Sequence, residues 1–190
     1  MSAFNILAIS GSLRRDSLNT RLLQAAVEVA ATDVRIDIFE GLADLPIFNE
    51  DLGIADSPRP VLELRERISA ADALLIATPE YNYAIPGGLK NALDWASLPP
   101  GQHCLRGKPV AVMGASMGNF GTVRAQLSLR QVWLWTEAIP VTKPEVHVFR
   151  AHERFDEQGA LIDQGTRALI SDLLDSLRSI AESRAAAGRR

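Results

Sequence analysis

The chain has 190 residues, 47% of them hydrophobic, and its 20 basic and 23 acidic residues give a formal net charge of −3. This balance predicts one domain with a sizeable core and no nucleic-acid partner, because no basic block precedes the terminal Arg189-Arg190. One cysteine excludes an internal disulfide, and no apolar run suits a signal peptide or membrane span, so we expect a cytoplasmic protein. No Cys/His cluster has zinc-site spacing, so we expect no metal.

Short apolar strands alternate with helical patterns along the chain. Strands are predicted at Phe4–Ile9, Val34–Phe39, Ala73–Ala77, Val110–Gly114 and about Glu145–Phe149, and helices at Asn19–Ala31, Val61–Ala70, Gly87–Ala96, Val123–Glu137 and Thr166–Glu182. This order predicts a single α/β domain over residues 1–182, with helices on both faces of a parallel sheet, and a disordered tail at 183–190. Ligands of such sheets bind beyond the carboxyl ends of the strands, so the loops at 10–19, 78–86 and 114–122 form the candidate site.

The loop after the first strand, Ser10 to Thr20, is rich in hydroxyl, amide and guanidinium groups. Such groups at a helix N-terminus suit a phosphate. The dinucleotide glycine pattern and the Walker pattern are both absent, which favours a terminal monophosphate over a pyrophosphate. The alternative is that Ser17, Asn19 and Thr20 only cap the helix, while Arg14 and its neighbour are solvated.

The loop after the third strand begins Thr78-Pro79-Glu80-Tyr81-Asn82-Tyr83 and runs through Pro86 into a helix. Its two prolines stiffen the backbone, and its two tyrosines offer a flat wall for a ring such as a flavin. The alternative is an ordinary turn that carries two surface tyrosines.

The segment Gly114-Ala115-Ser116-Met117-Gly118 follows a strand and matches the G-x-S-x-G pattern of a hydrolase nucleophile elbow. A triad would also need an acid and a later histidine, and only His147 and His152 follow Ser116. The glycine-rich segment of an oxyanion hole is absent. A serine hydrolase that uses Ser116 is therefore the rival interpretation.

The first two loops together resemble the NADPH-dependent FMN reductase family, which includes bacterial quinone and chromate reductases and some azoreductases. The matching residues are Gly11-Ser12-Leu13-Arg14 with Ser17 and Asn19, then Pro79-Glu80-Tyr81-Asn82, Pro86-Gly87 and Leu89-Lys90-Asn91-Ala92-Leu93-Asp94-Trp95. The likeness extends from Ile6 to about Arg167. It implies a flavodoxin-like three-layer sandwich with a five-stranded parallel sheet of order 2-1-3-4-5, and a homodimer or homotetramer that holds FMN between subunits.

The resemblance also implies the cofactor-binding residues. The phosphate would be surrounded by Ser12, Arg14, Ser17, Leu18, Asn19 and Thr20; the isoalloxazine ring would be lined, largely through backbone, by Pro79, Glu80, Tyr81 and Asn82; Ser116 would lie near the other edge of the ring. Two positions depart from the family pattern: Ala84, where members often carry Ser, and Met117, where many carry Pro. Both bear on substrate range.

The implied activity is that of an NAD(P)H-dependent oxidoreductase with a small acceptor: a quinone, a free flavin, an azo compound or chromate. FMN carries the redox chemistry, so no catalytic side chain is expected. Hydride passes from NADPH or NADH to the flavin, and the acceptor then takes the vacated face in a ping-pong cycle, with Arg14 or Arg15 expected to favour NADPH. A flavodoxin-like electron carrier without its own nicotinamide site is a further alternative.

Overall fold

The structure is a computed structural model that describes residues 3–54 and 56–187. Its strands are β1 (Phe4–Ser10), β2 (Val34–Phe39), β3 (Ala73–Ala77), β4 (Pro109–Ala115), β5 (Ile139–Pro140) and β6 (Val146–Val148). Its helices are α1 (Leu18–Val29), α2 (Arg59–Ala70), α3 (Gly87–Ala96), α4 (Val123–Thr136) and α5 (Gln164–Ala187), with short 3-10 helices at Gly41–Asp44, Glu50–Leu52 and Ala151–Glu153.

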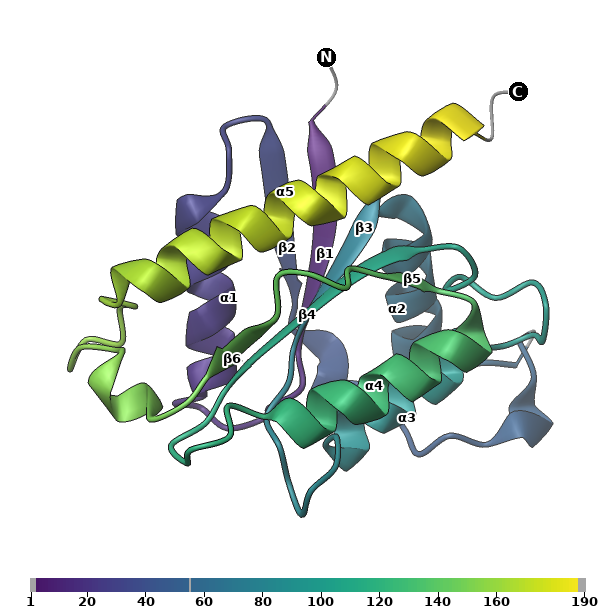
Figure 1. Ribbon diagram of the computed structural model, residues 1–190. Coiled ribbons are helices and arrows are strands. Elements are labelled where there is room, and N and C mark those ends of the chain that lie inside the picture. The colour runs from purple at the N-terminus through teal and green to yellow at the C-terminus, as the bar shows by residue number, and fades with distance from the viewer. Residues whose placement is uncertain (1–2, 55, 188–190) are drawn as a thin grey trace.

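The strands form one sheet in the order β2-β1-β3-β4-β5, and β6 pairs with the same strand β4 further along (Figure 1). Each of these pairings is parallel. The predicted flavodoxin-like order is therefore confirmed. The difference is at the edge, where the fifth strand is divided, because Pro140 and Pro144 have no N–H to donate to a ladder.

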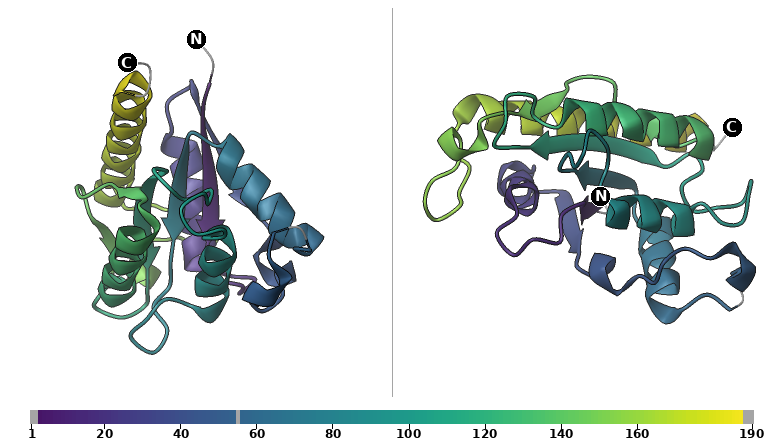
Figure 2. Two further views of the ribbon diagram at one scale, coloured as in Figure 1. Left: turned by 90° about the vertical axis from the view of Figure 1, so that its right-hand side faces the viewer. Right: turned by 90° about the horizontal axis from the view of Figure 1, so that it is seen from below.

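The sheet has a hydrophobic core on each face. One core contains Leu75 of β3 and residues of α1 and α5, and the other contains Leu74 of β3 and residues of α2, α3 and α4. Leu74 and Leu75 pack into opposite cores because successive side chains of a strand point to opposite faces of the sheet. Two further views show how the helices lie about the sheet (Figure 2).

The C-terminal helix is longer than predicted. The expected disordered tail at 183–190 is helical as far as Ala187, since alanine and arginine are strong helix formers, and residues 188–190 lie outside the described ones. No helix in the described part of the chain is long and apolar enough to span a bilayer.

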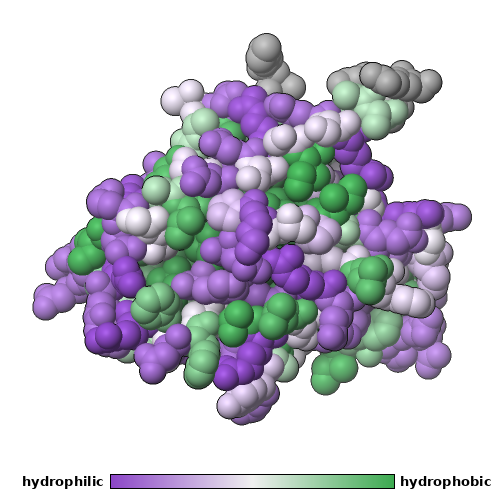
Figure 3. All heavy atoms as spheres, in the orientation of Figure 1, coloured by the Kyte–Doolittle hydropathy of each residue, from purple (hydrophilic) through white to green (hydrophobic). Residues whose placement is uncertain are grey.

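Helix α4 exposes large hydrophobic side chains to solvent. Trp133 is 1% exposed within the core, whereas Leu134 and Trp135 are 84% and 82% exposed. The space-filling view shows hydrophobic residues interspersed with hydrophilic ones on this side of the molecule (Figure 3). Exposed side chains of this size are typical of an interaction surface when they lie together.

Candidate active site

Three loops meet at one edge of the sheet. The first loop (residues 11–17) follows β1, the second loop (78–86) follows β3, and the third loop (116–122) follows β4, and these strands are adjacent and parallel (Figure 1). A Cβ atom on Gly11 would lie 3.2 Å from Cδ of Pro79 and 3.0 Å from Cδ2 of Leu89. Glycine at this position therefore lets the first and second loops approach closely.

The first loop leads into α1 through a hydroxyl cap. Ser17 Oγ accepts a hydrogen bond from the Thr20 N–H at 3.2 Å, and Thr20 Oγ1 lies 2.9 Å from Ser10 Oγ. Leu18 and Asn19 are the first two helical residues, so their N–H groups have no acceptor within the helix. These two amides and the buried Ser12 and Ser17 hydroxyls are donors of the kind that bind a phosphate.

Asn19 has a second role in the structure. Its Nδ2 donates to the Ala115 carbonyl at 3.1 Å, and its Oδ1 accepts from the Ala115 N–H at 2.9 Å. The side chain is buried and joins the start of α1 to the end of β4. A contact between Asn19 and a phosphate would thus use its backbone N–H.

The second loop is a tight hairpin. Tyr81 and Ala84 exchange two backbone hydrogen bonds of 3.0 Å, and the turn residues Asn82 and Tyr83 have φ values of 49° and 67°. Two successive positive φ values are the mark of a type I′ turn, in which Asn is common and Tyr is unusual. Tyr81 is half exposed and Tyr83 is exposed, so both rings are accessible at this edge.

The side chain of Glu80 points to α4. Its Oε2 accepts from the Arg124 N–H at 2.8 Å and the Ala125 N–H at 3.3 Å, and its Oε1 pairs with Arg124 Nη1 at 2.8 Å. Burial raises the pKa of this carboxyl group, but these hydrogen bonds and the guanidinium outweigh it, so the pKa of Glu80 lies below its ordinary value. Thr122, the N-cap residue of α4, has a left-handed backbone and makes no side-chain cap, so Glu80 replaces it in that role.

The third loop is hydrogen-bonded to the end of β6 and to the chain that follows it. The Ser116 N–H donates to the Val148 carbonyl at 2.9 Å, and the Ala151 N–H donates to the Ser116 carbonyl at 3.0 Å. Ser116 Oγ donates only a long hydrogen bond, 3.4 Å, to the Gly118 carbonyl. In the described residues Ser116 has no positive φ and no hydrogen bond to a histidine, so this geometry does not support the hydrolase triad.

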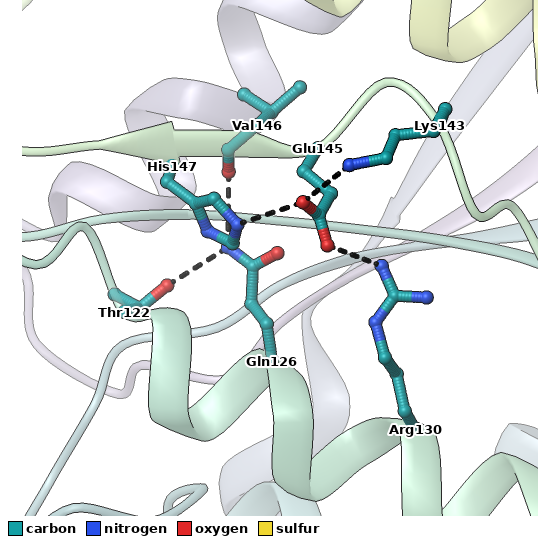
Figure 4. Close-up of polar contacts among 7 residues, drawn as sticks. All are labelled: Thr122, Gln126, Arg130, Lys143, Glu145, Val146 and His147. Atoms are coloured by element: carbon teal, nitrogen blue, oxygen red, sulfur yellow. Dashed lines mark hydrogen bonds and ion pairs between the residues drawn. The ribbon is translucent and has the colours of Figure 1, made fainter.

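A polar network supports the third loop from the side of β6 (Figure 4). Gln126 Nε2 donates to Thr122 Oγ1 at 3.1 Å and to the Val146 carbonyl at 3.0 Å. Close by, Glu145 accepts from Lys143 Nζ at 2.9 Å and from Arg130 Nη2 at 3.1 Å, and the Lys143 bond is the main cause of its lowered pKa. Burial lowers the pKa of His147, whose Nε2 lies 4.0 Å from Glu145 Oε2.

Large hydrophobic side chains from all three loops are exposed at this edge. They are Leu13 from the first loop, Tyr81 and Tyr83 from the second, and Met117 and Phe120 from the third. Hydroxyls and free helix amides are the donors that a flavin phosphate requires, and an apolar rim suits a flat isoalloxazine ring. The residues present therefore fit FMN.

Within residues 3–54 and 56–187, no group of three His, Cys, Asp or Glu side chains could hold a metal ion.

The structure brings together every residue that the sequence suggested for cofactor binding, on the three loops or the first turn of α1. Sequence reasoning missed Arg124, which contacts both Glu80 and the rings of the second and third loops. No local pattern marks it, because its partners lie up to 44 residues away.

The chain is similar to known flavin and quinone reductases in sequence and in structure. A sequence model of the NADPH-dependent FMN reductase family matches residues 4–153. An NAD(P)H-dependent FMN reductase of Pseudomonas aeruginosa is 47% identical over 173 residues, 91% of this chain and 92% of that protein. A quinone reductase of Escherichia coli is 39% identical over 163 residues, 85% and 86% of the two chains. Among solved structures, the flavoenzyme NAD(P)H:(acceptor) oxidoreductase FerB of Paracoccus denitrificans superposes with a TM-score of 0.85 at 36% identity, covering 95% of this chain and 98% of that one.

Proposed function

This chain belongs to the NADPH-dependent FMN reductase family, and we propose that it binds FMN across the three loops and reduces a small planar acceptor such as a quinone. It is an NAD(P)H-dependent FMN oxidoreductase, as its relatives are. When bound, FMN takes up hydride from the nicotinamide cofactor and passes the electrons to the acceptor. The residues of this chain bind and orient the reactants.

The phosphate end of FMN is assigned to the first loop and α1. The Leu18 and Asn19 amides, with the hydroxyls of Ser12, Ser17 and Thr20, are the donors, and the exposed Arg14 supplies positive charge. The Asn19 side chain is used by Ala115, so it acts by fixing the loops.

The ring is assigned to the second and third loops. Backbone groups of Pro79, Glu80, Tyr81 and Asn82 lie on one side and Ser116 on the other, because their strands are neighbours in the sheet. The exposed hydrophobic rim carries this proposal, since all three loops contribute to it and it suits flat, apolar reactants. Ala84 and Met117 are the positions at which substrate range is set.

The order of events is proposed as ping-pong. The nicotinamide cofactor and the acceptor would occupy the same open side of the site in turn, and bound FMN would carry the electrons from one to the other. Arg14 and Arg15 are both exposed on the first loop. One of them favours NADPH over NADH by binding the additional phosphate of NADPH.

Two further proposals complete this assignment. The chain works as a homodimer or homotetramer, with Leu134 and Trp135 of α4 covered by a second copy. Its location is the cytoplasm, a proposal supported by its low cysteine content and by the nicotinamide cofactors of its relatives.

Flavin binding is tested on the purified protein. We expect a yellow protein whose FMN, once removed, rebinds with quenching of flavin fluorescence at one FMN per chain. Replacement of Leu18 by Pro, which removes one of the two free amides at a first-turn position, weakens FMN binding. A colourless chain that does not quench added FMN would refute the assignment.

A further inference from the structure

The second and third loops are joined by contacts with Arg124 of α4. Arg124 Cζ lies 4.1 Å from the ring centroid of Tyr83 in the second loop and 4.2 Å from that of Phe120 in the third. Both distances are within the range of a cation–π contact. The guanidinium is thus stacked against one aromatic ring from each loop.

Glu80 holds that guanidinium in place. Its carboxylate pairs with Arg124 Nη1 at 2.8 Å while it also accepts the free N–H groups at the start of α4. The exposed fractions of the two side chains are 13% for Glu80 and 29% for Arg124, so solvent screens this pair less than a surface pair. We call these four residues, Glu80, Arg124, Tyr83 and Phe120, the loop clamp.

The clamp explains how an unfavourable backbone persists in the second loop. Tyr83 has a φ of 67°, a conformation that a bulky L-residue adopts at a cost. Such a residue stays in place only where its surroundings over-determine it. Here the Tyr81–Ala84 hydrogen bonds fix the turn and Arg124 fixes the ring of Tyr83.

We propose that Glu80 is a positioning residue for the flavin: through Arg124 and the start of α4, it presets the backbone of the second loop before the cofactor binds. This inference rests on the proposed function, because it assumes that the second loop lines the isoalloxazine ring. The positioning role belongs to the Glu80 carboxylate, which is directed to α4, whereas only the backbone of Glu80 is assigned to the ring. The backbone of the second loop therefore has its ligand-binding conformation before FMN binds.

The test compares substitutions at Glu80 with a matched substitution at the other end of the same helix. Glu80→Ala removes all three contacts, and Glu80→Gln keeps an acceptor for the α4 amides but loses the charge. The control is Glu137→Gln, because Glu137 caps the opposite end of α4 and its carboxylate pairs with Arg106 at 3.1 Å. Each protein is measured without FMN by hydrogen–deuterium exchange of residues 79–86, and then for its FMN dissociation constant and the visible absorbance of the bound flavin.

For Glu80→Ala we expect faster exchange in residues 79–86, an FMN affinity at least about tenfold weaker and a shifted flavin absorbance. Glu80→Gln should recover part of each effect, and Glu137→Gln should match the wild type. If Glu80→Ala lowers only the melting temperature, with exchange in this loop and FMN affinity unchanged, Glu80 is merely a helix cap and the inference is overturned. If the wild type fails to bind FMN, the proposed function fails, while the exchange comparison still decides whether Glu80 shapes the loop.

Discussion

The side chain of Asn19 hydrogen-bonds both backbone groups of Ala115, donating to its carbonyl at 3.1 Å and accepting from its N–H at 2.9 Å. Asn19 belongs to the first turn of α1, and Ala115 is the last residue of β4. The pair connects α1, the helix that follows β1, to β4, and β3 lies between β1 and β4 in the sheet. It therefore sets the distance between the proposed phosphate end and the third loop.

Replacement of Asn19 by Ala should lower the free energy of unfolding by about 3 kcal/mol, because it leaves a buried N–H and a buried carbonyl of Ala115 without partners. Urea denaturation measures this loss. Asn119→Ala, at an exposed position of the third loop, is the control and should stay within about 0.5 kcal/mol of the wild type. Equal stability of the two variants would mean that the Asn19 bonds have little net value.

Two substitutions at Ser17 should separate helix capping from ligand binding. Ser17→Ala removes the N-cap oxygen and should cost about 1 kcal/mol of unfolding free energy, whereas Ser17→Gly should cost only a few tenths. Both lack the hydroxyl, so both should weaken FMN binding if Ser17 contacts the phosphate. An unchanged FMN dissociation constant for Ser17→Gly would leave Ser17 as a cap alone.

The sequence predicted all five helices and a parallel sheet, because these depend on local periodicity and on the handedness of βα units. The order of the strands, which the structure confirms, came from the resemblance to the family. It did not predict the division of the edge strand, since the pairing of β5 and β6 with β4 depends on where Pro140 and Pro144 fall in the register. The helical extension to Ala187 was missed because a small-residue tail was interpreted by composition.

The site was predictable in its loops and less so in its contacts. The carboxyl ends of β1, β3 and β4 had to meet once the sheet order was known. The contacts of Glu80 with α4 and of Asn19 with Ala115 join residues 44 and 96 positions apart, and no local pattern encodes them. Glu80 was expected to line the ring through its backbone. The contacts of its carboxylate with Arg124 were not expected.

The stability of the protein should decrease as the pH falls below about 6.5, in part through His147. Burial lowers the pKa of His147 from 6.5, although Glu145 and a Gly121 backbone contact oppose this. The unfolded chain therefore takes up a proton at a higher pH than the folded protein, so stability is complete above the ordinary value and is lost as the pH falls toward the folded one.

Replacement of His147 by Gln should make this decrease shallower between about pH 7 and pH 5 in urea denaturation series. The control is His152→Gln, because His152 is half exposed and lies outside the network of Figure 4. Identical pH profiles for wild type and His147→Gln would show that other groups cause the decrease.

Trp135 offers a test of the proposed assembly. Trp135→Glu adds a charge where a side chain is 82% exposed, so it should leave the fold stable but reduce the molar mass measured by light scattering from that of a dimer or tetramer toward that of the monomer. Exposed Val27→Glu on α1 is the matched control and should keep the assembly. Equal masses for both variants would place the interface elsewhere.

We propose that NADPH reduces FMN bound at the edge formed by the three loops. The most direct measurement is anaerobic stopped-flow mixing of the FMN-loaded protein with NADPH, followed by mixing of the reduced protein with a benzoquinone. We expect rapid bleaching of the visible flavin band and its rapid return with the quinone. A band that NADPH does not bleach would contradict this account and indicate an electron carrier, and a colourless protein whose Ser116 reacts with a fluorophosphonate would indicate a hydrolase.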